Sequence, residues 1–238
     1  MFAVLTAVAK RTQMIFSNIE AGIAAAGLVP RGAFHPSPAD RLPPLPDGRA
    51  AGTLVLVGFA GGQGWPAFAA SPEAADGEPH PLDRWSRRVI GALAEAVGAA
   101  PLFPFGGPPF LPFHEWARAA EPVFTSPLGV LIHPRWGLWH SYRGALAFAE
   151  RITLPARAQA VSPCDGCAAR PCLDACPVGA FTAKGYDVPA CVGHLRSGDG
   201  TACLTTGCLA RGACPVGAEH RYTPAQAEFH MAAFLAAQ

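Results

Sequence analysis

The chain has 238 residues, of which 50% are hydrophobic, and its 18 Lys and Arg nearly balance its 17 Asp and Glu. This length allows one sizeable core or two small ones. The balanced charge argues against a general nucleic-acid surface, which normally shows a basic excess. The apolar residues 1–9 precede Lys10 and Arg11, the reverse of the order in a secretory signal. We therefore expect a cytoplasmic protein without a membrane span, starting at Met1 or Met14.

The first elements in chain order are a helix, a coil and a strand. Residues 15–26 predict a helix that ends at Gly27, a residue suited to the turn after a helix. The segment 30–46 is so rich in proline that we expect no regular structure there. Residues 53–57 are β-branched or Leu and are followed by glycine, which predicts a buried strand.

The middle of the chain mixes helices and strands. Apolar residues recur at every fourth position over 82–97, which predicts an amphipathic helix. The patterns that follow predict a strand at 102–105, a helix at 113–120, and strands at 129–132 and 141–152 joined by a turn at 133–137. Because these elements do not alternate strictly, the fold class that we expect is α+β.

A shift to small polar residues at 155–163 marks the expected domain boundary. The first domain then covers residues 1–158, a small cysteine-rich module covers 159–220, and a C-terminal helix lies in 221–238. Phe229, Ala233 and Phe234 fall on one side of that helix, so we expect it to pack back on the body.

All eight cysteines of the chain lie between Cys164 and Cys214. A disulfide scaffold would usually distribute its bridges through a small secreted chain. Crowding in one Gly- and Pro-rich segment instead indicates a metal site that is kept reduced. The spacings are Cys-x2-Cys-x4-Cys-x3-Cys-Pro and then Cys-x11-Cys-x4-Cys-x5-Cys-Pro, close to the pattern of bacterial two-cluster ferredoxins.

An internal repeat supports two 4Fe–4S clusters. The sequence Ala-Cys-Pro-Val-Gly-Ala at residues 175–180 recurs unchanged at 213–218, as expected of a duplicated cluster-binding half. In such proteins the cysteine before the proline ligates the other cluster. The first predicted ligand set is therefore Cys164, Cys167, Cys172 and Cys214. The second is Cys176, Cys191, Cys203 and Cys208. The alternative is structural zinc, which Cys-x2-Cys also suits, although zinc does not explain the repeated Cys-Pro ending.

Several segments together resemble the group of epoxyqueuosine reductases, reductive dehalogenases and cobalamin-processing proteins. They are Pro-Leu-Asp-Arg-Trp-Ser-Arg-Arg at 81–88, His-Glu-Trp-Ala-Arg at 114–118, Leu-Gly-Val-Leu-Ile-His-Pro-Arg-Trp-Gly-Leu-Trp at 128–139 with Arg143-Gly144, and Cys-Val-Gly-His at 191–194. The resemblance covers roughly residues 81–217. It implies a nitroreductase-like N-terminal domain that holds cobalamin, followed by a small bacterial-type two-cluster ferredoxin module.

The chain also departs from this group. Residues 120–128 replace its Gly-rich turn, residues 106–113 offer no clear counterpart of its acidic proton donor, and its C-terminal helical repeats are absent. The resemblance therefore supports the fold and a redox role, while the specific chemistry is left open.

Two weaker features are candidates for a bound cobalamin or flavin. The loop with Gly61, Gly62 and Gly64 follows a predicted strand and can present backbone N–H groups to a phosphate. Its other interpretation is a tight strand-to-helix turn. His133 and His140 flank two tryptophans and can coordinate cobalt or donate a proton. Alternatively, each is a histidine that bonds to nearby backbone.

Three functions compete on this basis. The first is an iron–sulfur electron-transfer protein that passes electrons to a redox partner protein or a small-molecule acceptor. The second is a corrinoid- or flavin-dependent reductase related to epoxyqueuosine reductase. The third is a tRNA-modifying enzyme, which the balanced charge and the absent repeats disfavour.

Overall fold

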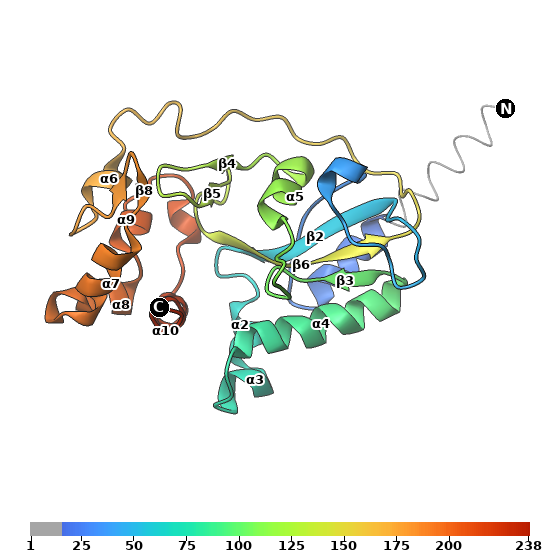
Figure 1. The fold of residues 1–238 in the computed structure, drawn as a ribbon, viewed down its shortest axis with the longest axis horizontal. Coiled ribbons are helices and arrows are strands. Elements are labelled where there is room, and N and C mark those ends of the chain that lie inside the picture. Colours follow the sequence, from blue (N-terminus) through green and yellow to red (C-terminus); the bar gives the residue numbers. More distant parts are fainter. Residues whose placement is uncertain (1–15) are drawn as a thin grey trace. The chain divides into compact units, whose positions relative to one another are not determined.

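The computed structural model describes residues 16–238, which form two compact units (Figure 1). The first unit comprises the chain up to Phe59, then Gln63–Pro122 and Ser141–Gln159. The second comprises Ala60–Gly62, Val123–His140 and Ala160–Gln238. The second unit thus takes in two segments that precede the cysteines. The domain boundaries expected at 158 and 220 stay a prediction.

A four-stranded sheet lies at the centre of the first unit, with the strand order β1-β2-β6-β3. The strands are β1 (Val29–Phe34), β2 (Thr53–Ala60), β6 (His140–Phe148) and β3 (Ala100–Leu102). β1 pairs antiparallel with β2, and β3 pairs antiparallel with β6. All eight residues of β2 are buried, which fits an inner strand of a sheet that is covered on both faces.

Helices cover this sheet. In Figure 1, α4 (Pro81–Val97) and α5 (Phe113–Ala120) lie on opposite sides of it. A helix at 16–25 packs beside α4, where Gly22 approaches Leu93. The shorter elements are η1 (Pro38–Asp40), α2 (Trp65–Ala69) and α3 (Pro72–Ala75). The mixture of helices and strands agrees with the expected mixed class.

Helix predictions in this unit are confirmed, and some strand predictions are wrong. The helices expected at 82–97 and 113–120 are α4 and α5. The helix expected at 15–26 is present over 16–25, and residue 15 lies outside the described residues. Contrary to expectation, Pro30 lies in a strand. β1 is an edge strand, where a residue without an N–H group is tolerated.

Two further strand predictions need correction. The strand expected at 102–105 is β3, which runs over Ala100–Leu102 and so begins earlier. The strands expected on either side of the turn at 133–137 exist as β5 (Leu131–Ile132) and β6, but they do not pair with each other. β5 pairs with β4 (Phe124–Thr125) instead. Residues 133–137 close a separate small loop, because His133 and Gly137 form an isolated bridge.

Gly58 in β2 is fixed by close packing. A Cβ at this position would lie 1.9 Å from the backbone oxygen of Ser141. We expect Gly58→Ala to lower the free energy of unfolding by about 1–3 kcal/mol or more, since overpacking forces the backbone apart. The matched control is Gly91→Ala in α4, where a Cβ meets nothing within 4 Å. In the control variant, the free energy of unfolding should instead rise by about 0.5–1 kcal/mol, because alanine favours a helix more than glycine does. Urea denaturation followed by circular dichroism measures both, and equal effects would contradict the packing argument.

The second unit consists of short elements. Its helices are α6 (Pro171–Asp174), α7 (Val188–Arg196), η2 (Gly198–Gly200), α8 (Thr201–Thr206), α9 (Leu209–Gly212), η3 (Ala218–His220) and α10 (Pro224–Ala236), and its strands besides β4 and β5 are β7 (Phe181–Thr182) and β8 (Gly185–Tyr186). The expected C-terminal helix is confirmed as α10, which packs on α8. Such short elements bury little by themselves, so packing around the cysteines must hold this unit together.

Residues 50–72 carry no charged side chain, yet they fold into β2, a turn and α2. Within the described part of the chain, no helix combines the length and the apolar character that crossing a bilayer requires.

Candidate metal centre

The eight cysteines lie in turns and at the ends of short helices of the second unit. Cys164 and Cys167 share one tight turn, in which the Cys167 amide donates to the Cys164 carbonyl at 3.3 Å. The Cys164 amide donates to Ser162 Oγ, also at 3.3 Å. The remaining cysteines lie in or next to α6, α7, α8 and α9. Short helices of this kind place successive thiols at different points around one small volume.

Cys164 has the other members of the first predicted set as neighbours. Burial raises the pKa of its thiol, and the nearby thiols of Cys214, Cys172 and Cys167 raise it further, in that order. Burial also raises the pKa of Cys172, and Cys214 and Cys167 add to this effect. Cys214 therefore lies close to Cys164 and Cys172, which precede it by many residues.

The other four thiols form a second neighbourhood. Burial raises the pKa of Cys203, a backbone hydrogen bond opposes this, and the thiols of Cys191 and Cys176 raise it further. Burial likewise raises the pKa of Cys208, with added contributions from Cys203 and Cys191. Cys176 is thus a neighbour of cysteines that follow it in the chain. Their role as ligands stays a prediction.

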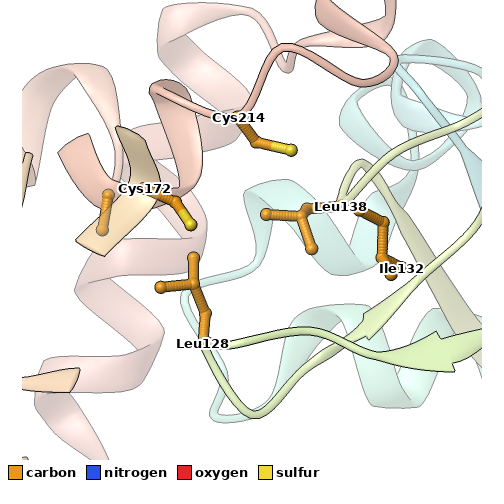
Figure 2. Close-up of a cluster of buried hydrophobic side chains, with 6 residues drawn as sticks. Leu128, Ile132, Leu138, Cys172 and Cys214 are labelled. Atoms are coloured by element: carbon orange, nitrogen blue, oxygen red, sulfur yellow. The ribbon is translucent and has the colours of Figure 1, made fainter. Parts of the chain in front are cut away.

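Apolar side chains enclose the first neighbourhood. Cys172 and Cys214 are buried with Leu128, Ile132, Leu138 and Ala210, and Cys164, Cys176 and Cys208 pack against this cluster. Figure 2 shows the sulfur atoms of Cys172 and Cys214 on the side that faces Leu128 and Leu138. Two of these leucines come from the hairpin segment 123–140, so a segment that precedes the cysteines supplies part of their environment. An apolar, partly closed environment of this kind tunes a metal centre by limiting solvent access.

The second neighbourhood receives hydrogen bonds and an aromatic cover. The Ala180 amide donates to Cys176 Sγ at 3.3 Å. Tyr186 stacks on Phe181, with ring centroids 4.8 Å apart and planes 11° from parallel. Burial raises the pKa of the Tyr186 hydroxyl above its usual range, and its neighbour Cys191 raises it further. Tyr186 therefore remains a neutral hydrogen-bond donor next to a predicted ligand.

The thiol arrangement suits iron–sulfur clusters. Each 4Fe–4S cluster requires four thiolates, and the described residues supply two groups of four neighbouring cysteines. A zinc site would need all ligands about 2–2.3 Å from one ion. Among residues 16–238, no three His, Cys, Asp or Glu side chains are grouped so as to hold a single metal ion. The metal content of the protein decides between these two centres.

The histidines proposed for cofactor binding are bonded to backbone. His133 Nδ1 accepts the amides of Arg135 and Trp136 at 3.0 and 3.3 Å. His140 is buried, and its Nε2 donates to the Leu131 carbonyl at 3.0 Å. The ring centroids of these two histidines are 6.2 Å apart. Both side chains therefore have structural roles that their positions explain.

The glycine loop has two parts. In the second unit, the Gly61 amide donates to the Trp139 carbonyl at 2.6 Å. A Cβ on Gly62 would lie 3.8 Å from Gln226 Oε1. Gly64 belongs to the first unit and immediately precedes α2, a helix of only five residues. The structure thus associates Gly61 and Gly62 with Trp139 and Gln226.

Gln226 and Trp139 carry a signal that sequence reasoning missed. Gln226 is wholly buried, and neither atom of its amide has a hydrogen-bond partner among the described residues. Trp139 Nε1 is likewise buried, and no group in the described part of the chain bonds to it. Buried polar groups normally have partners, so such groups indicate an unseen water or ligand. The sequence hints at this site only through a polar residue, Gln226, in the otherwise Ala-rich first turns of α10.

Comparisons with known proteins place the fold. A solved epoxyqueuosine reductase in complex with a modified tRNA-Tyr stem loop matches 90% of this chain and 68% of its own, with a TM-score of 0.53 and 14% identity. An epoxyqueuosine reductase from Bacillus subtilis matches 88% of this chain and 68% of its own, with a TM-score of 0.49 and 14% identity. No family model and no curated protein matches the chain. The chain therefore resembles the epoxyqueuosine reductase group in its fold, as the sequence motifs indicated.

Proposed function

We propose that this chain is an iron–sulfur oxidoreductase with the fold of epoxyqueuosine reductase. A bacterial-type ferredoxin module would hold two 4Fe–4S clusters and pass electrons to an acceptor that a nitroreductase-like domain binds. The observation that carries the proposal is the exchange of neighbours between the two motifs. Cys214 neighbours Cys164 and Cys172, whereas Cys176 neighbours Cys203. This exchange is expected where the cysteine before each proline serves the other cluster.

The residues of the chain would hold these clusters and set their environment. The first set comprises Cys164, Cys167, Cys172 and Cys214, and the second comprises Cys176, Cys191, Cys203 and Cys208. When bound, such clusters supply one-electron transfer. Leu128 and Leu138 limit solvent access to the first set, and the Ala180 amide donates to Cys176 in the second. Hydrogen bonds to sulfur and exposure are the features by which a protein adjusts cluster potentials.

A second candidate is the reductase proper, with a bound corrinoid or flavin as the acceptor. The side-chain amide of Gln226 and Trp139 Nε1, both buried without a hydrogen-bond partner among the described residues, favour it. Gln226 Oε1 and the Trp139 carbonyl both lie against the Gly61–Gly62 loop. Amide-rich corrins and the imide edge of a flavin offer the donors and acceptors that these groups lack. His133 and His140 fit less well, since backbone groups already bond to one ring nitrogen of each, Nδ1 of His133 and Nε2 of His140. Gly64 stays a candidate on its sequence position alone.

Anaerobic reconstitution with iron and sulfide tests the cluster proposal. We expect about eight irons and about eight acid-labile sulfides per chain, with broad visible absorption that reduction bleaches. About four irons would refute one of the two ligand sets. Stoichiometric zinc in the protein as purified, with no uptake of iron, would refute both.

Titration of the reconstituted protein with cobalamin and with flavin tests the second candidate. We expect a saturable change in the cofactor spectrum that Gln226→Leu weakens at least tenfold, because the leucine fills the space without hydrogen-bonding groups. The control is Gln63→Leu, an exposed glutamine next to the same loop. If neither cofactor binds, the second candidate is refuted and the electron-transfer protein remains as the proposed function.

With the balanced charge of the chain, we propose no general nucleic-acid binding. A gel-shift with a tRNA stem loop, the ligand in the solved relative, checks that point.

A further inference from the structure

Arg211 lies in the short helix whose backbone connects the two predicted ligand sets. It lies in α9, between Cys208 and Cys214. Its carbonyl accepts the Cys214 amide at 3.3 Å, and the next residue, Gly212, donates its amide to the Cys208 carbonyl at 2.9 Å. The same single turn of helix therefore orients one cysteine of each set.

The guanidinium group of Arg211 is held in a fixed position. Its Nε and Nη2 atoms donate to the Leu138 carbonyl at 3.1 and 2.5 Å. Its Cζ atom lies 4.5 Å from the ring centroids of both Trp139 and Tyr222. The centroids of the two rings are 5.2 Å apart, and the ring planes meet at 70°. Two ring contacts and a forked hydrogen bond leave this side chain little rotational freedom.

Among the described residues, the Arg211 guanidinium has no acidic partner. None of the ion pairs of residues 16–238 includes Arg211, although Arg31, Arg84, Arg88 and Arg143 each pair with a carboxylate. A carbonyl and two aromatic rings attract a cation without cancelling its charge. Arg211 thus places a full positive charge in a half-buried position, where screening by water is incomplete.

One residue, Leu138, links this charge to the first predicted cluster site. Leu138, whose carbonyl holds the guanidinium, packs in the same buried group as Cys172 and Cys214. Reduction of a cluster adds one negative charge to a centre that four thiolates already make negative. A fixed cation nearby favours the reduced form, because the attraction to it grows when the electron arrives.

We propose that Arg211 is a positioning residue that raises the reduction potential of the cluster held by Cys164, Cys167, Cys172 and Cys214. The inference rests on the proposed function. The cluster takes up one electron from the reductant, and Arg211 neither gains nor loses a proton or a bond. Its effect is purely electrostatic, and the Leu138 carbonyl together with the rings of Trp139 and Tyr222 fixes the position from which it acts.

The test is a redox titration of the reconstituted protein, monitored by electron paramagnetic resonance with dithionite as the reductant. Arg211→Gln should shift the one-electron equilibrium of one cluster about tenfold toward the oxidised form, which corresponds to about −59 mV. Arg211→Lys keeps the charge and should retain most of the potential. Arg196→Gln, an exposed arginine of the same unit, controls for net charge and should leave both potentials unchanged.

The outcomes separate this inference from the proposed function. If the wild-type protein takes up no iron, the proposed function fails. If Arg211→Gln binds about eight irons and keeps both potentials, the inference fails while the function stands. Should the glutamine variant lose iron, Arg211→Lys decides. If the lysine variant binds about eight irons but its reduction equilibrium is shifted tenfold toward the oxidised cluster, a role for charge is refuted. If the lysine variant has the wild-type reduction potential, a role for charge is supported.

Discussion

Replacing Cys214 by alanine is expected to halve the iron content of the reconstituted protein, from about eight to about four irons per chain. The remaining cluster should be the one that Cys176, Cys191, Cys203 and Cys208 hold. The physical reason is the position of Cys214, which is buried with Cys172 and neighbours Cys164. Removal of one of four thiolates leaves an iron without its protein ligand, so that cluster does not assemble stably.

A comparison of variants makes this prediction sharp. Cys164→Ala should remove the same paramagnetic signal as Cys214→Ala, although the two positions lie at opposite ends of the cysteine-rich segment. Cys176→Ala should remove the other signal, although it is closer in sequence to Cys164. Ser197→Ala alters an exposed hydroxyl in the same unit and should retain about eight irons. If Cys176→Ala and Cys164→Ala removed the same signal, ligands would follow sequence order, and the crossed assignment would be wrong.

Removing the carboxylate of Glu121 is expected to cost about 3–5 kcal/mol of unfolding free energy, the largest effect in the first unit. Arg31 is wholly buried and donates to Glu121 Oε1 at 2.6 Å and to the Phe59 carbonyl at 2.7 Å. The Tyr142 hydroxyl donates to the same carboxylate oxygen at 2.6 Å. In Glu121→Ala, Arg31 keeps its charge in the core without a counterion, which is the costly state.

The neighbouring ion pair supplies the control. Arg41 and Glu115 bond at 2.8 Å, but their side chains are 65% and 56% exposed, against 1% and 12% for Arg31 and Glu121. Glu115→Ala should therefore cost less than about 1 kcal/mol. Urea denaturation followed by circular dichroism measures both variants. The double variant Arg31→Met with Glu121→Leu should recover part of the loss, because it buries no unpaired charge. Equal costs for the two alanine variants would contradict the role of burial.

The sequence predicted the parts of this protein that local chemistry decides. Apolar spacing located α4 and α5, and a run of β-branched residues located β2. Cysteine spacing and the repeated Cys-Pro ending gave a crossed ligand assignment that is specific enough to test. These signals depend on residues that are near each other in the chain, so they can be read without the fold.

The features that sequence missed depend on distant partners. Pro30 was expected in coil because it begins a proline-rich segment. That it lies in an edge strand follows only from the order of the strands in the sheet. The sequence joined the strands at 129–132 and 141–152 by a turn and gave no sign of β4, the upstream strand with which β5 pairs. The surroundings of Arg211 are a further example, because its ring contacts come from residues on both sides of the cysteine-rich segment. No local pattern encodes these relations.

The loop at 133–137 and the second Cys-Pro motif fit back to back. A Cβ on Gly137 would lie 1.9 Å from the Val216 oxygen, and a Cβ on Gly217 would lie 2.5 Å from the backbone of Trp136. Here a cut between the α/β sequence and the cysteines would leave the loop, Leu128 and Leu138 behind. Residues 160–238 without residues 123–140 would therefore lack part of the packing around their cysteines.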